Sequence, residues 1–296
     1  MPNAKPFVKW AGGKGQLLNQ IRNTYPRGLG ETVIRYCEPF VGGGAVLFDV
    51  LNNYNLDEIY INDINAELIN TYRIIQSDVS SLIETLHKLQ SEFTPLDTEN
   101  RKIYYYQKRD QFNNEKVNGN RFTNLHKAAL FIFLNKTCFN GLYRVNGSGL
   151  YNVPMGAYKN PLICDSENLI NISKLLQNVI INCSDYKECY DFVDEHTFVY
   201  IDPPYRPLNS TANFTSYTEN GFGDREQIEL AEFVNELNQI GASIVVSNSD
   251  PQNTDVGDNF FDELYSLYRI SRVTARRMIN CNAERRGTVN ELLICN

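Results

Sequence analysis

The sequence is poor in histidine, has no paired cysteine motif and contains no long apolar run. Its three histidines, His87, His126 and His196, are widely scattered, which disfavours a histidine-based metal or nucleophile site. The seven cysteines form no CxxC pair, so neither a zinc site nor a disulfide framework is indicated. No apolar stretch approaches the ~20 residues of a membrane span, and the N-terminus lacks the apolar segment of a signal peptide. We therefore expect a soluble, cytoplasmic protein with no metal and no membrane contact.

Positive charge is also scarce, since the formal net charge is −7, but it is unevenly distributed. Residues 101–160 contain ten Lys or Arg and only two acidic residues, a local balance of +8. A second basic cluster near the C-terminus consists of Arg269, Arg272, Arg276, Arg277, Arg285 and Arg286. This asymmetry is typical of a protein that grips nucleic acid with one face, although solvated helix faces would explain either cluster alone.

Short apolar segments rich in β-branched residues predict the buried strands of an α/β sheet. They are residues 33–40, 58–65, 179–185, 197–205 and 243–250. Ligands of such sheets bind at the carboxyl ends of the strands. The polar residues at these predicted ends are Glu38, Asp63, Asp185, Asp202 and the pair Ser247–Asn248. They define a candidate site.

The apolar spacing becomes helical between the second and third predicted strands. It predicts a helical stretch over 66–90 and a further helix around 126–138, followed by a Gly/Asn-rich loop to about Lys159. The basic segment thus coincides with a helical insertion. We predict a catalytic domain of residues 1–66 and 164–296, with an inserted domain of residues 67–163.

Two glycine-rich segments are candidates for binding a nucleotide-like ligand. In "FVKWAGGKGQLL", Val8 and Gly15 replace the first glycine and the final hydroxyl of a phosphate-binding loop, which disfavours that interpretation. "EPFVGGGAVLF" follows the first predicted strand and opens a helix. Leu47 replaces the third glycine of a dinucleotide fingerprint, yet Asp63 lies where an acid can hold an adenosine-type ribose. A plain tight turn is the alternative for the glycines.

The most specific chemistry lies in "IDPPY", Ile201 to Tyr205. Pro203 and Pro204 fix the backbone and remove two N–H donors, so nearby carbonyls can accept hydrogen bonds from a ligand. If Asp202 and the Pro203 carbonyl accept both hydrogens of an aromatic amine, its lone pair turns toward an electrophile while Tyr205 stacks on the ring. Orienting the amine and a methyl donor could supply up to ~7–11 kcal/mol of the barrier. A proline-rich strand end without function is the alternative.

Four motifs in this order, "FVKWAGGK", "EPFVGGG", "DPPY" and "TANFTSY", resemble the Dam family of DNA adenine methyltransferases, of the D12 class, which modify the exocyclic amine of adenine in GATC. The resemblance extends from Phe7 to about Leu293. It implies an α/β fold, a Rossmann-like S-adenosylmethionine-dependent methyltransferase sheet with an inserted helical target-recognition domain. It also implies direct in-line methyl transfer to double-stranded DNA, without a metal. The target adenine must be flipped out of the duplex. Pairing with a restriction endonuclease stays open, and no stable protein partner is implied.

The same resemblance assigns the site residues. The catalytic group would be Asp202, Pro203, Pro204 and Tyr205. S-adenosylmethionine would be bound by Trp10, Ala11, Gly12, Lys14, Glu38, Pro39, Phe40, Gly42, Gly44, Asp63 and Asp202. DNA would be bound by Lys9, Asn140, Leu142, Arg144, Pro154, Tyr158, Asn213 and Phe214.

Individual roles in base reading also follow from the resemblance. Arg144 would contact one guanine, Lys9 with Tyr158 the other, and Leu142 with Pro154 the thymine methyl. These roles suit an arginine that donates twice to a guanine edge and apolar groups that meet a methyl. The segment after the catalytic motif, which includes Phe214 and Tyr217, is expected to fold over the flipped base.

The sequence leaves two alternatives open. One is methylation of a different amine, either in cytosine or in a glutamine side chain. Asp202 and the basic insertion favour adenine in DNA over both. The other is a DNA-binding module that has lost catalysis, which would require a damaged donor pocket, whereas Trp10, Lys14 and Asp63 are all present.

Overall fold

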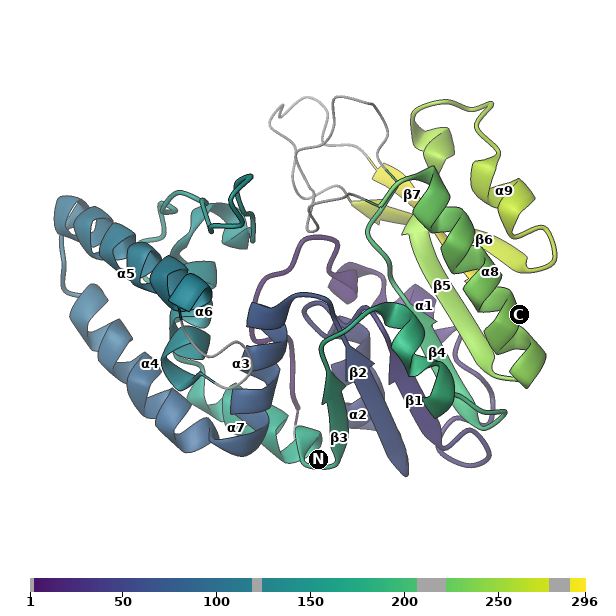
Figure 1. Ribbon diagram of the computed structural model, residues 1–296, viewed down its shortest axis with the longest axis horizontal. Helices are drawn as coiled ribbons and strands as arrows, with labels where there is room; N and C mark the ends of the chain where they lie inside the picture. The colour runs from purple at the N-terminus through teal and green to yellow at the C-terminus, as the bar shows by residue number, and fades with distance from the viewer. Residues whose placement is uncertain (1–2, 119–123, 207–221, 277–287) are drawn as a thin grey trace. The chain divides into compact units, whose positions relative to one another are not determined.

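The computed structural model describes residues 3–118, 124–206, 222–276 and 288–296 (Figure 1). The chain divides into two compact units, which are described separately. The first unit comprises Met1–Gly13, Gly42–Asn53 and Asn62–Asp185. The second unit comprises Lys14–Val41, Tyr54–Ile61 and Tyr186–Asn296. The domain boundaries expected from the sequence, after residues 66 and 163, stay a prediction.

All five strands expected from the sequence are present. They are β1 (Arg35–Glu38), β2 (Glu58–Asn62), β3 (Val179–Asn182), β4 (Thr197–Ile201) and β5 (Ser243–Ser249). Two further strands, β6 (Arg269–Arg276) and β7 (Thr288–Cys295), complete the sheet formed by the described residues, in the order β3-β2-β1-β4-β5-β7-β6. β1 pairs in parallel with β2 and β4, β4 pairs in parallel with β5, and β7 pairs antiparallel with β5 and β6. The predicted α/β fold is confirmed.

The parallel register brings the ends of β4 and β5 together. Ile201 lies opposite Val246, so the next residues along the two strands, Asp202 and Ser247, are neighbours at the carboxyl edge. Glu38 ends β1, which is β4's other parallel neighbour, and therefore lies at the same edge. This edge of the second unit holds one part of the candidate site.

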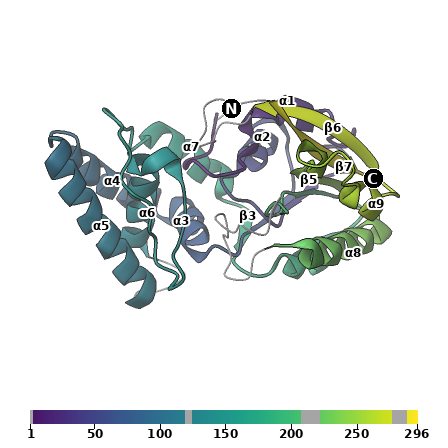
Figure 2. The same ribbon diagram turned by 90° about the horizontal axis from the view of Figure 1, so that it is seen from above.

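One face of this sheet is covered by α8 (Asp224–Ile240), which runs along β5 (Figure 2). Leu230, Val234 and Leu237 of α8 pack in one apolar core with alternate residues of the strands, such as Ile201 and Ile244. On β4, the residues between these core positions include Phe198, whose ring contacts Tyr25 at 5.3 Å between centroids. β4 is therefore covered on both faces, as its continuous apolar sequence predicts.

The second unit also contains several short helices. They are the 3-10 helices η1 (Lys14–Gln16), η3 (Tyr186–Phe192) and η5 (Pro251–Asn253), and the α-helices α1 (Leu18–Arg22) and α9 (Phe260–Leu264). Arg272 on β6 forms ion pairs with Asp250 (3.0 Å) and Asp262 (2.7 Å). This arginine of the second basic cluster therefore has a structural role within the unit.

The first unit is mainly helical. Its helices are α2 (Ala45–Asn53), α3 (Ala66–Ser77), α4 (Val79–Phe93), α5 (Thr98–Asn118), α6 (Leu125–Thr137), η2 (Phe139–Gly141) and α7 (Ser166–Leu176) (Figure 1). α6 agrees with the helix expected around 126–138 and is buried almost all round, between α3, α4 and α5. The stretch over 66–90 is two helices rather than one, because Asp78 leaves helical geometry and its carboxylate accepts a hydrogen bond from the N–H of Ser81 (3.2 Å).

Candidate active site

In the second unit, the carboxylate of Asp202 follows β4 and is anchored through one oxygen. Lys14 Nζ lies 2.7 Å from Oδ1, and Ser247 Oγ donates to the same oxygen at 2.9 Å. The hydroxyl of Tyr200 donates to Ser247 Oγ (3.0 Å) and thereby fixes the serine. Among the described residues, both partners of Asp202 contact Oδ1. Oδ2 is therefore left to accept a hydrogen bond from a substrate.

Lys14 and Tyr205 belong to the same network. The Lys14 ammonium, only 3% exposed, donates to Tyr205 Oη at 2.7 Å. Tyr205 Oη in turn donates to Glu291 Oε2 on β7 at 2.8 Å, and Lys14 Nζ lies 3.7 Å from that oxygen. One buried ammonium is thus shared by two carboxylates and one phenol, an arrangement that restricts the motion of Tyr205.

Burial governs the pKa values in this network. It raises the pKa of Tyr205 well above the usual value, and the neighbouring Asp202 and Glu291 carboxylates raise it further. The phenol is therefore a neutral hydrogen-bond donor. Burial also raises the pKa of Glu291, although the Lys14 ammonium and the Tyr205 hydroxyl oppose this shift.

The backbone of the Asp-Pro-Pro-Tyr segment is held from α8. Gln227 Nε2 donates to the carbonyl of Pro204 (3.0 Å), and its Oε1 accepts from Asn248 Nδ2 (3.0 Å). The carbonyl of Pro203 has no hydrogen-bond partner within the part of the chain that the structure describes. A fixed loop with one open carbonyl beside a half-anchored carboxylate can receive both hydrogens of an amino group.

The predicted donor residues at the end of β1 also belong to the second unit. Glu38 is 2% exposed and accepts a hydrogen bond from Tyr36 Oη (2.7 Å). Pro39 leads to Phe40, whose ring stacks on Tyr186 with 5.2 Å between centroids. The Glu38–Phe40 segment is thus anchored at both ends.

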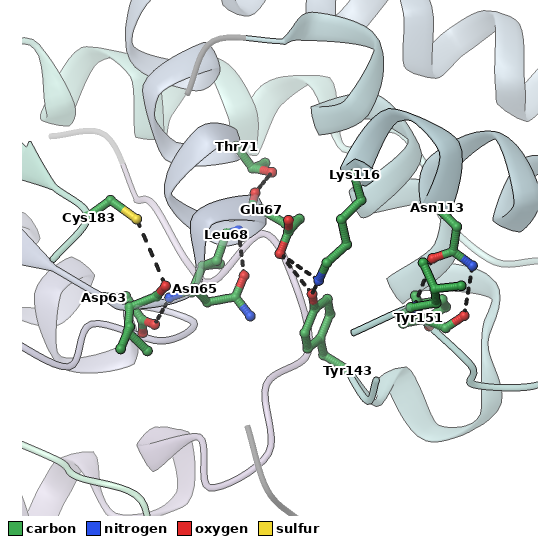
Figure 3. Close-up of polar contacts among 12 residues, drawn as sticks. Asp63, Asn65, Glu67, Leu68, Thr71, Asn113, Lys116, Tyr143, Tyr151 and Cys183 are labelled. Atoms are coloured by element: carbon green, nitrogen blue, oxygen red, sulfur yellow. Dashed lines mark hydrogen bonds and ion pairs between the residues drawn. The ribbon is translucent and has the colours of Figure 1, made fainter. Parts of the chain in front are cut away.

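In the first unit, the structure brings Trp10, Gly42 and Asp63 together. The carboxylate of Asp63 accepts the N–H of Gly42 at Oδ2 (3.0 Å) and the N–H of Asn65 at Oδ1 (2.9 Å; Figure 3). Burial raises the pKa of Asp63 to about 6, although both N–H groups oppose the shift. A Cβ atom on Gly42, where φ is +46°, would lie 2.8 Å from Trp10 Cδ1, so the indole lies directly against this turn.

The remaining glycines fit the same tight turn. Gly44 has φ +74°, and a Cβ there would lie 2.5 Å from Tyr72 Oη, which itself donates to the carbonyl of Gly42 (3.1 Å). Ala11 and Gly12 lie in a turn closed by the N–H of Gly13 and the carbonyl of Trp10 (3.1 Å).

The predicted DNA-reading residues with described positions all lie in the first unit. Lys9 Nζ donates to Tyr158 Oη (3.1 Å) and lies 4.5 Å from the centre of that ring. The exposed Arg144 donates from Nε to Asn152 Oδ1 (2.7 Å). Asn140 has φ +56°, the one positive φ of a non-glycine residue in the described ranges. Such strain is typical of functional loops.

The other residues of this loop are placed by the backbone around α6 and η2. Leu142 follows η2, and the carbonyl of Pro154 accepts the N–H of Phe139 (2.9 Å). Asn213, Phe214 and Tyr217 lie outside the described residues.

Sequence reasoning missed Asn135, a buried amide at the end of α6. Its Oδ1 accepts the N–H of Lys9 (2.8 Å), and its Nδ2 donates to the carbonyls of Lys9 (2.8 Å) and Gly141 (3.0 Å). We call this arrangement the Asn135 clamp. It ties the segment of Lys9 and Trp10 to the loop that carries Leu142. An asparagine in the otherwise apolar stretch "AALFIFLN" was the available signal.

Glu291 was also missed. It lies on β7 in the segment "VNELLIC", where a single acid precedes an apolar run. The sequence signals Glu291 only as a charged residue just before an apolar run, because the partners of Glu291, Lys14 and Tyr205, are remote along the chain.

Within the described ranges, no group of three or more His, Cys, Asp or Glu side chains could hold a metal ion. No helix in the described part of the chain is long and apolar enough to cross a membrane.

The sheet and the Asp-Pro-Pro-Tyr segment at the end of β4 fit a methyltransferase that acts on an amino group. Residues 10–279 match the D12 class of N6 adenine-specific DNA methyltransferases, and the chain belongs to this family. It is similar to the type II methyltransferase M.MjaIII of Methanocaldococcus jannaschii, with 50% identity over 99% of both chains. It is also similar to the DNA adenine methylase of Escherichia coli K12, with 34% identity over 99% of this chain and 95% of that protein.

A further relative is the DNA N-6-adenine-methyltransferase of Escherichia phage P1, which is 34% identical over 98% of this chain and 35% of that protein. The resemblance found in the sequence is confirmed at the level of the family. The protein is an adenine-specific DNA methyltransferase.

Proposed function

We propose that this enzyme takes its methyl group from S-adenosylmethionine, flips the target adenine out of the duplex and acts at GATC. The observation that carries the proposal is the Asp202 carboxylate, which is anchored at Oδ1 by Lys14 and Ser247 and open at Oδ2. An anchored acceptor beside an open Pro203 carbonyl suits an exocyclic amine rather than a ring nitrogen, because an amine has two hydrogens to donate.

The residues around Asp63 fit the donor. Two backbone N–H groups orient this carboxylate, which can then accept the hydroxyl hydrogens of a ribose. The glycines at 42 and 44 leave no room for a Cβ, and Trp10 offers a flat surface against the turn. We therefore assign donor binding to Trp10, Gly42, Gly44 and Asp63.

The family resemblance also assigns Lys14, Glu38, Pro39, Phe40 and Asp202 of the second unit, and Ala11 and Gly12 of the first, to donor binding. When bound, the donor supplies a methyl group on a sulfonium sulfur. The protein's own groups then act on the adenine. Asp202 Oδ2 and the Pro203 carbonyl accept the two hydrogens of the amine, which turns its lone pair away from the aromatic ring.

Lys14, 2.7 Å from Asp202 Oδ1, stabilises the negative charge of Asp202 until the methyl group is transferred. Tyr205 is held by Lys14 and Glu291, so its ring can stack on the adenine without rotating. In this proposal Asp202 then accepts the proton that the methylated amine loses and becomes neutral. Methyl transfer from a sulfonium develops no charge that needs a divalent cation.

Recognition of GATC is proposed for the first unit. Arg144 would donate to one guanine, Lys9 with Tyr158 to the other, and Leu142 with Pro154 would meet the thymine methyl. Asn140 shapes the loop, and Asn213 and Phe214 would contact the flipped base. The type II name of the relative with 50% identity supports a pairing with a restriction endonuclease. An enzyme acting on genomic DNA would work in the cytoplasm.

The test is transfer of labelled methyl from S-adenosylmethionine to two duplexes that differ only in GATC against GGTC. We expect label in the first duplex alone. Equal label in both duplexes would refute GATC specificity but would still support methyl transfer from S-adenosylmethionine to DNA. Asp202→Ala should abolish transfer yet retain duplex binding. A 2-aminopurine at the target position should gain fluorescence on binding if the base is flipped, and an unchanged signal would refute base flipping.

A further inference from the structure

A buried polar cluster of the first unit lies outside the machinery assigned so far. Glu67 of α3 is 7% exposed and accepts hydrogen bonds at Oε2 from Tyr143 Oη (2.9 Å) and Lys116 Nζ (3.1 Å; Figure 3). Lys116, on α5, also donates to Tyr143 Oη (3.0 Å). Each member therefore contacts the other two. We call Glu67, Lys116 and Tyr143 the Tyr143 cluster.

One side of the cluster faces the residues assigned to the donor. The ring of Tyr143 stacks on Trp10 with 5.7 Å between centroids and 27° between planes. Trp10 lies against Gly42, whose N–H binds Asp63. Glu67 is the second residue of α3. The side chain of Asn65 caps the start of this helix, and the N–H of Asn65 donates to Asp63. The Tyr143 ring, through Trp10 and Gly42, and the start of α3, through Asn65, thus both connect the Tyr143 cluster to Asp63, the carboxylate assigned to the ribose.

The other side of the cluster belongs to the base-reading loop. Tyr143 stands between Leu142 and Arg144 in the sequence, so the contacts that hold its side chain also restrain the backbone between these two residues. The carbonyl of Leu142 is held separately by Tyr151 Oη (3.2 Å). Tyr143 is 8% exposed and therefore has little freedom of its own.

A structural role alone is a weak explanation of this cluster. The Glu67 side chain is 9% exposed and that of Lys116 is 20% exposed, so both charges are largely removed from water. That removal costs about as much free energy as the attraction between the charges supplies, so such an ion pair contributes little to stability compared with apolar packing. Such pairs are better explained where they fix one conformation among several. Here the fixed conformation is that of the Tyr143 ring, which contacts Trp10 on the donor side and belongs to the base-reading loop.

We propose that the Tyr143 hydroxyl, held by Glu67 and Lys116, is a positioning group that couples donor binding to base reading. The inference rests on the proposed roles of Trp10 and Arg144. With the hydroxyl fixed, a ligand that orders Trp10 also orders the loop of Arg144, and the right base sequence orders Trp10 in return. Coupling of this kind must be reciprocal between the two ligands.

The test uses the full-length enzyme and S-adenosylhomocysteine as the probe. Its Kd is measured by calorimetry alone, with a GATC duplex and with a GGTC duplex. For the unaltered enzyme we expect the GATC duplex to tighten binding about tenfold more than the GGTC duplex does, within the usual range of coupling. The Tyr143→Phe variant keeps the ring stack and loses the hydroxyl. Its coupling should fall to about twofold or less, with little change in the Kd of the probe alone.

A matched control is Tyr104→Phe, which removes another tyrosine–glutamate hydrogen bond of the same unit, from Tyr104 Oη to Glu92 Oε2 (2.6 Å). This variant should retain full coupling. Glu67→Gln keeps an oxygen that accepts from Tyr143, so it should restore part of the coupling relative to Glu67→Ala. Full coupling in Tyr143→Phe would overturn the inference, as would equal losses in Tyr143→Phe and Tyr104→Phe. If the unaltered enzyme methylates GATC selectively yet shows no coupling, the inference fails while the proposed function stands.

Discussion

Replacing Glu291 with glutamine gives the sharpest test of the proposed catalytic role of the network of Lys14, Tyr205 and Glu291. The substitution keeps an oxygen that can accept from Tyr205 Oη, now at 2.8 Å from Oε2, but removes the charge that attracts Lys14 across 3.7 Å. A hydrogen bond to a charged group contributes about 1.5–3 kcal/mol and a neutral one about 0.5–1.5 kcal/mol. The difference of about 1–1.5 kcal/mol corresponds to about a five- to tenfold slower methyl transfer.

Glu291→Leu removes the acceptor altogether. It should cost the whole charge-assisted bond, about 10- to 150-fold in rate. The assay is single-turnover transfer from a preformed complex with a GATC duplex, because this measures the chemical step apart from product release. Duplex affinity should not change, because in the described part of the chain the side-chain contacts of Glu291 are with Lys14 and Tyr205, neither of which is assigned to base reading. The melting temperature of the Gln variant should not fall, because a buried carboxylate is costly to keep.

The pH profile supplies a second readout for Glu291. Burial raises the pKa of Glu291, so its charge is lost at higher pH than for an ordinary glutamate as the pH falls. The single-turnover rate should therefore decline on the acid side, and this part of the decline should be missing in Glu291→Gln. Unchanged rates in both variants would refute the positioning of Tyr205 by Glu291. A loss of duplex binding and folding together would show that the residue is merely structural.

Three further outcomes are expected. The pKa of Asp63 is raised to about 6, so its ionised form is lost as the pH falls through 6. The Kd for S-adenosylhomocysteine should therefore rise about tenfold per pH unit below that value. Asp63→Asn should remove this pH dependence. Gly44→Ala should weaken donor binding and lower stability by about 1–3 kcal/mol, measured by calorimetry and thermal melting, because the new Cβ would lie 2.5 Å from Tyr72 Oη; unchanged binding would disprove the tight turn. Arg144→Ala should reduce discrimination at one guanine about five- to 150-fold in competition binding, and Asn152→Ala, which frees Arg144 Nε, should act in the same direction more weakly; a uniform loss for all duplexes would contradict base reading.

The sequence predicted those elements whose signal is local. The five buried strands were evident because their apolar runs are continuous, and α6 was evident from its length and composition. β6 was missed because its arginines were counted as a basic cluster. One of them, Arg272, is paired with Asp250 and Asp262, so its charge is satisfied within the unit.

The candidate catalytic motif could be found from the sequence, but the residues that hold it could not. Asp202, Pro203 and Tyr205 are contiguous, so their chemistry is visible in five letters. Glu291 lies 86 residues beyond Tyr205, and Asn135 lies 126 residues beyond Lys9. Contacts between residues so far apart along the chain are made only in the folded protein, and sequence periodicity cannot predict which residues will be partners.

The Asn135 clamp has a consequence for how such an enzyme can change its target site. Lys9, which is assigned to a base, directly precedes Trp10, which is assigned to the donor, and one amide holds the backbone of Lys9 at both its N–H and its carbonyl. A mutation that retunes this segment for a new base would also disturb the donor side. Arg144, by contrast, is exposed and is held through Asn152 within its own loop. Laboratory selection for new recognition sequences should therefore accumulate its changes around Arg144 and leave the Lys9–Trp10 step intact.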